Sequence, residues 1–370
     1  MSKINISLVG GQPFPVYAQI LDNRPDMAIL VCSEQTETDA SRIKSVIERT
    51  LPGTGVSLLK IPAKDNALAN VHIKVQSDVY CKPGHDVTVN LAGGTKPWSL
   101  LFAKHFSGKA KLVFIDQNNI IWDMDTLEHH ELSPQGISLE DLTALHGVRI
   151  HRKTDVSSLT TPDLELLRQI EEARNWSPQS FQELTSTPVT RIDRSGEELA
   201  WNKDSRTFTL TLCHRRQGFR TFELTAPHVR NLVLNYGWFE AKVGLLLSEW
   251  PLARRVWLNT EITLPTEQQV LNELDVIIET TTGKFLFVEC KTKVSKPTDI
   301  DKFNDVVKKT GGTGAKRIFI TERTMSGLPL SKCKQTKMPH YALTDITADR
   351  AVTAQFFGQL NDYMGIINER

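Results

Sequence analysis

Charged side chains interrupt an otherwise apolar stretch in the C-terminal third of the chain. Two runs rich in Val, Ile, Leu and Phe, residues 273–279 and 284–291, flank the turn-forming residues 280–283. Apolar runs of this length around such a turn predict an antiparallel β-hairpin. Strands that pack into a core rarely carry charge, so the acids and the lysine of this hairpin are candidates for chemistry.

The register of the hairpin predicts that two carboxylates face each other. If the turn centres near Thr282, facing residues have numbers that sum to about 564, which sets Asp275 opposite Glu289. Lys291 projects from the same face as Glu289 because strand side chains alternate. Facing carboxylates repel unless a cation lies between them, and Mg²⁺ or Mn²⁺ prefers such oxygen ligands. A divalent ion beside an ammonium favours hydrolysis of a phosphodiester.

A third acid lies on the apolar stripe of a predicted helix. Residues 236–247 have helical spacing, Pro251 ends the pattern, and Glu240 occupies a position of the apolar face. A buried acid needs a partner, and an ion held by the hairpin would be one. Two simpler interpretations stay open: a cross-strand ion pair in the hairpin, and a solvated glutamate near a helix start.

The first 150 residues alternate strand-like and helix-like segments. Such alternation predicts a mainly parallel sheet with helices on both faces, which is a Rossmann-like α/β fold. We expect strands at residues 4–9, 27–32, 56–61, 86–91 and 111–115, and helices at residues 39–50, 66–75 and 97–106.

Three of these strands run into turns that could bind a phosphate-bearing ligand. In α/β folds, ligands bind where strand ends meet helix N-termini. The turn at residues 93–96 precedes a helix and offers paired glycines, a hydroxyl and a cation, although it is not a Walker A sequence. Glycine-rich turns also serve plain chain reversal, which is the simpler interpretation of residues 10–11. The candidate ligand-binding residues are Gly10, Gly11, Gln12, Ser33, Glu34, Thr36, Gly93, Gly94, Thr95 and Lys96.

Length and composition limit the remaining possibilities. A chain of 370 residues suggests two domains that each bury a core. Lys and Arg number 44 against 43 Asp and Glu, so a nucleic-acid surface would be a local patch. The five cysteines form no C-x-x-C pair, which argues against a zinc site. Without a long apolar run, we expect no membrane span and a cytoplasmic protein.

We expect an α/β domain at residues 1–150, a connector or dimerisation region at 151–235 and the domain that carries the hairpin at 236–370; the family resemblance given below implies that the first is a sensor domain and the last a nuclease domain. A basic cluster in the connector is more often a solvated face than a nucleic-acid contact; it comprises His214, Arg215, Arg216 and Arg220. Further expected elements are helices at 162–175, 298–309 and 346–363, and strands at 208–212, 222–224 and 317–321.

The order of these motifs resembles two known families. A helix glutamate, then an Asp, then Glu-x-Lys across a hairpin resembles the PD-(D/E)xK nuclease superfamily, although Leu274 stands where that name has Pro. This resemblance implies a restriction-endonuclease-like α/β domain with Glu240, Asp275 and Glu289 as metal ligands and Lys291 as the catalytic lysine. The segment VNLAGGTKPWSLLFA at residues 89–103 looks like the CARF domains of CRISPR-associated proteins.

Together the two halves resemble the CARF nucleases that accompany type III CRISPR systems. That resemblance implies a homodimer that binds cyclic tetra-adenylate and then cleaves DNA, single-stranded RNA or both. A two-fold ligand suits a two-fold dimer. A restriction or repair endonuclease with a DNA-reading N-terminal domain and a non-catalytic cyclic-nucleotide sensor are the alternatives. Residue types alone do not distinguish DNA from RNA, because phosphate contacts carry no such information.

Overall fold

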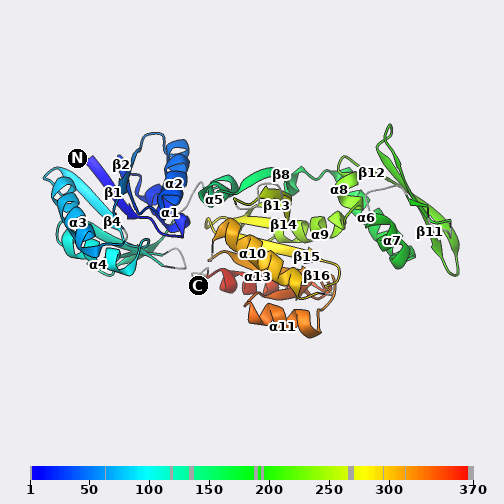
Figure 1. Ribbon diagram of the computed structural model, residues 1–370. Coiled ribbons are helices and arrows are strands. Elements are labelled where there is room, and N and C mark those ends of the chain that lie inside the picture. The colour runs from blue at the N-terminus through cyan, green and yellow to red at the C-terminus, as the bar shows by residue number, and fades with distance from the viewer. Residues whose placement is uncertain are drawn as a thin grey trace.

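The computed structural model describes residues 2–62, 64–116, 120–132, 137–186, 191–192, 196–265, 271–294, 296–312 and 314–365. Their strands form three sheets, of seven, six and four strands. The seven-stranded sheet lies at one end of an elongated molecule, the six-stranded sheet in the middle and the four-stranded sheet at the other end (Figure 1). No helix of these residues is long and apolar enough to cross a membrane.

The N-terminal sheet has the strand order β3-β2-β1-β4-β5-β6-β7. The first five strands in this order are parallel, which confirms the predicted α/β fold, and β6 and β7 extend the sheet as an antiparallel edge that the sequence did not predict. The strands are β1 (Ser2–Leu8), β2 (Met27–Cys32), β3 (Gly55–Lys60), β4 (His85–Asn90), β5 (Lys111–Ile115), β6 (Ile120–Asp123) and β7 (His129–Glu131).

Helices cover both faces of this sheet. On one face, α3 (Asn66–Tyr80) and α4 (Lys96–Phe106) pack their apolar side chains on β1, β2 and β4. On the other face lie α1 (Pro13–Asn23), α2 (Glu37–Thr50) and α5 (Leu139–Leu145). The sequence missed α1, whose first turn holds two prolines, because proline is usually a helix breaker and is tolerated only at a helix start.

The middle sheet has the strand order β17-β16-β15-β14-β13-β8. The predicted hairpin is confirmed as β14 and β15, and Val276 pairs with Val288, as the predicted register requires. The edge strand β8 pairs with β13, although it lies about 100 residues upstream of β13 in the sequence. The strands are β8 (Arg149–Asp155), β13 (Ala253–Thr263), β14 (Leu271–Thr280), β15 (Phe285–Lys291), β16 (Lys316–Thr321) and β17 (His340–Ala342).

Alternating side chains divide this sheet between two cores. α10 (Thr298–Gly311) and α11 (Gly327–Gln335) pack on one face, and α9 (Gly237–Ser248) and α13 (Arg350–Met364) pack on the other. The single closing helix expected at residues 346–363 is wrong at its start. α12 (Leu343–Ile346) is separate, because the Asp349 side chain caps α13 by accepting from the Val352 N–H.

The third sheet, in the order β12-β11-β10-β9, projects from the far end of the molecule (Figure 1). Its two predicted strands are confirmed as parts of the long hairpin β11–β12, which pairs from Thr207 with Thr225 to His214 with Gly218. The division of the chain at residues 150 and 235 stays a prediction. The elements of this region are η1 (Val156–Ser158), α6 (Thr161–Trp176), α7 (Pro178–Thr185), β9 (Arg191–Ile192), β10 (Glu198–Asn202), β11 (Thr207–His214), β12 (Gly218–Thr225) and α8 (Val229–Val233).

Candidate functional site

The hairpin of β14 and β15 brings two acids together near the open end of its ladder. The last backbone pair on that side joins Val276 to Val288, and Asp275 and Glu289 are the next residues along the two strands. The Asp275 carboxylate accepts a hydrogen bond of 2.7 Å from the Cys290 N–H. Asp275 is only 5% exposed, so its charge is largely removed from water.

Lys291 and Glu240 complete the predicted set. The Lys291 Nζ lies 2.8 Å from Glu289 Oε1 and 3.7 Å from Asp275 Oδ2. Glu240 comes from the first turn of α9 and is 8% exposed, as expected of an acid on the apolar stripe. Its carboxylate accepts a hydrogen bond from the Asn259 side chain.

Asn259 is a member of the site that the sequence did not reveal. The pairs Leu258 with Val276 and Thr260 with Leu274 place it across from Asp275 on β13, where the ladder with β8 is irregular. Its φ of 48° lies in the left-handed region, which asparagine adopts more readily than most residues. The period-two pattern of β13 could have revealed this strand, but not which strand it would pair with.

Crowding of the acids changes their proton affinities. Burial raises the pKa of Glu289 to about 8, and the charge of Asp275 adds to this shift. Burial, followed by repulsion from Asp275 and Glu273, raises the pKa of Glu240. Burial alone would lower the pKa of Lys291, but the surrounding carboxylates outweigh it and raise that pKa. Ionisation of these buried acids therefore raises the free energy of the folded protein, and a nearby cation would lower it.

The donor set fits a hard divalent cation by its chemistry. Glu240, Asp275 and Glu289 supply carboxylate oxygens from three elements, and oxygen is the preferred donor for Mg²⁺ and Mn²⁺. Among the described residues, however, no three acid, His or Cys side chains already converge as a ligand set would. The Lys291 ammonium lies against Glu289 and near Asp275, so it provides the positive charge there. A divalent ion bound by these carboxylates would therefore share them with the ammonium.

The predicted ligand turns meet at the carboxyl edge of the N-terminal sheet. β1 and β4 are neighbours, and the strand order changes direction between them, which is where α/β folds bind ligands. A Cβ on Gly93 would lie 1.8 Å from the Leu8 carbonyl oxygen, so only glycine fits there. A Cβ on Gly10 would lie 2.9 Å from the backbone nitrogen of Gly94. The two glycine turns therefore form one surface.

The remaining ligand candidates border the same edge. The Thr36 hydroxyl accepts a hydrogen bond of 3.0 Å from the Ser33 N–H and thereby closes the turn after β2. Thr95 caps α4 by accepting from the Trp98 N–H, and Lys96, the first residue of that helix, is exposed. The start of α4 thus faces this edge with a partial positive charge and a lysine, although Pro97 has no N–H and the N–H of Trp98 is already bound by Thr95. That these residues bind a ligand stays a prediction.

Comparison with known families identifies this N-terminal domain. Residues 4–141 match the family model of the Card1 CARF domain. The N-terminal domain is a CARF domain. The expected resemblance is thereby confirmed for this part of the chain, and the predicted ligand turns are turns of a CARF sheet.

Solved structures share the fold of nearly the whole chain. Can2 from Sulfobacillus thermosulfidooxidans, solved with cyclic tetra-adenylate, is 17% identical at a TM-score of 0.69, over 98% of this chain and 99% of its own. Protein VC1899 from Vibrio cholerae is 16% identical at a TM-score of 0.75, over 98% of each chain. A type III CRISPR defence DNA nuclease activated by cyclic oligoadenylate is 18% identical at a TM-score of 0.56, over 89% of this chain and 47% of its own. The comparison with curated proteins gave no match.

One contact joins the CARF turns to the carboxylate site. A Cβ on Gly312, just past α10, would come within 2.7 Å of Gln12 Oε1 and 3.2 Å of a His146 ring carbon. The opposite end of α10 supplies Asp299 and Lys302 to a cavity of about 370 Å³ that Asp275, Glu289 and Lys291 also line. α10 therefore spans the distance from a predicted ligand turn to the predicted catalytic residues.

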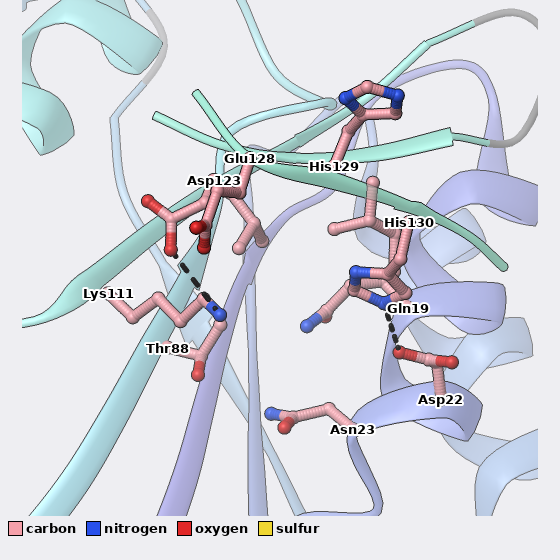
Figure 2. A pocket seen from close by; sticks show the side chains of 11 residues that line it. Gln19, Asp22, Asn23, Thr88, Lys111, Asp123, Glu128, His129 and His130 are labelled. Carbon is pink, nitrogen blue, oxygen red and sulfur yellow. Dashed lines mark hydrogen bonds and ion pairs between the residues drawn. The ribbon is translucent and has the colours of Figure 1, made fainter. Parts of the chain in front are cut away.

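A separate cavity of about 580 Å³ opens in the CARF domain, and no residue of the glycine turns lines it. Figure 2 shows the side chains that surround this cavity. Its walls include His130, which lies 3.3 Å from Asp22, and Lys111, which lies 3.4 Å from Asp123. Lys111 begins β5, so the cavity lies toward the amino ends of the parallel strands, opposite the ligand turns. It contains none of the predicted site residues.

The basic cluster of the connector lies on the projecting sheet. Arg220 pairs with Glu172 at 2.7 Å, and the His214 ring packs against Trp176. Arg215 and Arg216 are exposed at the hairpin turn. The cluster is thus partly neutralised by the protein itself, which agrees with its interpretation as a solvated face.

Proposed function

We propose that this protein is a metal-dependent nuclease switched on by cyclic tetra-adenylate. The observation that supports this most strongly is the burial of three electrostatically coupled acids, Glu240, Asp275 and Glu289, with Lys291 beside two of them, in a chain whose N-terminal part is a CARF domain. Such a set is costly to maintain for stability alone, because buried like charges raise the free energy of the folded state. A role in catalysis therefore explains the burial of these charges better than a role in stability does.

Each residue has a distinct role in the proposed hydrolysis. Glu240, Asp275 and Glu289 would hold the ion, which is Mn²⁺ or Mg²⁺ and which when bound polarises the phosphoryl oxygen and lowers the pKa of water. Lys291 lies beside the same carboxylates, where its ammonium can orient the attacking water or stabilise charge on the phosphate. Asn259 positions Glu240 by donating a hydrogen bond to it.

The proposed activator is a cyclic oligoadenylate. CARF is the family of the sensor domain, Can2 was solved with cyclic tetra-adenylate, and a further structural neighbour is described as activated by cyclic oligoadenylate. The glycine turns and Lys96 offer backbone amides and a cation at the sheet edge, which suits phosphates. We propose that the ligand contacts the residues predicted from the sequence at this edge, from the turns after β1, β2 and β4.

The proposed active form is a homodimer. α3 exposes an apolar stripe in which successive members are three or four residues apart, and Leu100 on the adjacent α4 adds to it. The stripe consists of Leu68, Val71, Val75 and Val79. Both helices start at the ligand edge, so a second copy packed on this stripe would bring two sets of turns around one two-fold ligand.

The proposed coupling runs through α10. A ligand can shift the nuclease only if it prefers one arrangement of the molecule. Gln12 in a ligand turn contacts Gly312 at one end of α10, and Lys302 near the other end lines the catalytic cavity. A movement of the turn would therefore be transmitted to the wall of the catalytic site.

Mutation of one metal ligand tests the proposal. We expect Glu289→Gln to reduce cleavage of DNA and single-stranded RNA at least about 100-fold and to weaken Mn²⁺ binding measured by calorimetry. Binding of cyclic tetra-adenylate should be unchanged. The matched control is Glu165→Gln, an exposed acid of α6. Cleavage at the wild-type rate by Glu289→Gln would remove the hairpin from the mechanism.

Cleavage by wild-type protein without ligand would favour a restriction or repair endonuclease.

A further inference from the structure

A second hollow lies beside the catalytic carboxylates, and Glu240 is the only predicted site residue among those that line it. It has a volume of about 420 Å³, and its walls come from α8, the start of α9, β13, β14 and β8. Glu240 lines this hollow, whereas Asp275, Glu289 and Lys291 line the catalytic cavity next to α10. Glu273 lines both, so the acids stand between two adjoining hollows.

Arg230 gives the second hollow a cation that is available to a ligand. It is exposed, and it makes no ion pair with any acid among the residues that the structure describes. Its guanidinium carbon lies 5.6 Å from the centre of the Trp201 ring, a distance at which arginine is attracted to the ring face. Arg152, the other arginine of the hollow, is instead held by Glu261 at 2.7 Å.

The wall that carries Arg230 is fixed relative to Glu240. A Cβ on Gly237 would lie 1.7 Å from the Asn231 carbonyl oxygen, so the end of α8 and the start of α9 are in direct backbone contact. Glu240 follows Gly237 on the same helix within one turn. A group bound by Arg230 is therefore held at a constant place beside the catalytic acids, as positioning of a substrate requires.

The polar groups of the hollow suit a nucleotide. A guanidinium binds phosphate through a planar fork of donors. The exposed side chains of Asn231 and Asn235 offer both donors and acceptors, which base edges and sugar hydroxyls can use. The volume is at the small end of the range for ligand sites, enough for roughly one nucleotide and too small for a stacked base pair. A nucleotide enters such a hollow only when it is unpaired.

On the basis of the proposed nuclease function, we propose that this hollow is a substrate subsite for one unpaired nucleotide next to the bond that is cut, with Arg230 binding its phosphate. The acids of the hollow keep that phosphate on the arginine side by repulsion. The strand then passes over Glu240 and Glu273 into the catalytic cavity, where Lys302 is exposed. The substrate class is single-stranded nucleic acid, or duplex that is locally open.

Binding of short oligonucleotides by full-length protein tests this subsite. The probes are fluorescent single-stranded DNA, the same sequence as RNA and the corresponding DNA duplex, measured by anisotropy with cyclic tetra-adenylate and Mn²⁺ present. A Glu289→Gln background prevents cleavage. Arg230→Gln is compared with Arg230→Lys and with Arg350→Gln, an exposed arginine at the start of α13 that lines neither hollow.

We expect Arg230→Gln to weaken binding of at least one single strand about tenfold or more, and to reduce the salt slope by about 0.7, the loss of one phosphate contact. Arg230→Lys should restore part of the affinity, and Arg350→Gln should bind like the parent protein. Preference for the DNA or the RNA probe shows whether the hollow tolerates the 2′-hydroxyl. Unchanged affinity and slope in Arg230→Gln, no single-strand binding, or equally strong binding of the duplex would each overturn the proposal.

The two proposals fail in different ways. If wild-type protein cleaves nucleic acid on addition of ligand but Arg230→Gln binds single strands normally, the subsite is wrong and the nuclease stands. If Arg230→Gln loses single-strand binding but wild-type protein never cleaves, the hollow is a binding site and the nuclease is wrong.

Discussion

The two candidate sites of this protein are built in opposite ways. The carboxylate site gathers acids whose pKa values are raised: burial raises those of Glu240 and Glu289, and the charge of Asp275 adds to the shift. The CARF edge consists of turns in close backbone contact, with exposed Lys96 as its cation. The first site depends on added positive charge, and the second is a preformed surface that awaits a ligand. The difference predicts that mutations in the two sites affect separate measurements.

Replacing the site's own cation should have the largest effect. We expect Lys291→Met to reduce cleavage at least about 100-fold, because charge developing on the phosphate loses its ammonium partner. Mn²⁺ binding should be retained or stronger, because the ammonium no longer competes for Asp275 and Glu289. Cleavage assays and calorimetry measure the two effects. Lys44→Met on α2 is the control, and loss of Mn²⁺ binding in Lys291→Met would contradict the account.

Removing the cation of the CARF edge should affect only the ligand. We expect Lys96→Ala to weaken binding of cyclic tetra-adenylate about 10- to 100-fold, which is the effect of losing one charge-assisted hydrogen bond to phosphate. Saturating ligand should restore the wild-type cleavage rate. Equilibrium binding and the ligand dependence of cleavage measure this, with Lys104→Ala, an exposed lysine later in α4, as the control. Unchanged affinity would remove Lys96 from the ligand site.

The contact between the two regions should control activation rather than binding. A side chain on Gly312 collides with Gln12, so we expect Gly312→Ala to reduce activation by ligand about 5- to 50-fold. Gly312 has a φ of 82°, and the substitution also strains the backbone. Gly327→Ala is the matched control, because its φ is 68° and no atom lies near its Cβ. Equal activation in both variants would show that α10 does not couple the sites.

The smallest expected effect is on stability in the absence of metal. The folded-state pKa of Glu289 is about 8, above its unfolded value, so its contribution to stability is present at low pH and is lost as the pH rises toward 8. We expect the Tm in EDTA to be lower at pH 8.5 than at pH 5.5, by about 3 °C or more. Mn²⁺ or Glu289→Gln should reduce this difference. An equal difference in Glu289→Gln would assign it to other groups.

The sequence predicted the parts that depend on local patterns. Alternation and turn residues located β14 and β15 with their register, and the apolar stripe of α9 explained why Glu240 is buried. The sequence did not predict the role of Asn259, because that role depends on the pairing of β13 with β14, which periodicity does not specify. The sequence also did not predict the hollow that Arg230 lines or the approach of Gln12 to Gly312. Both bring together segments that are far apart in the chain. Local patterns specify elements, whereas their neighbours depend on tertiary packing.

Cleavage by wild-type protein with and without ligand tests the central claim most directly. Labelled single-stranded RNA, single-stranded DNA and supercoiled plasmid are incubated with Mn²⁺, in the presence or absence of cyclic tetra-adenylate. The account predicts cutting of at least one substrate only when the ligand is present. Cutting at the same rate without ligand would contradict the claim that the CARF domain controls the carboxylate site.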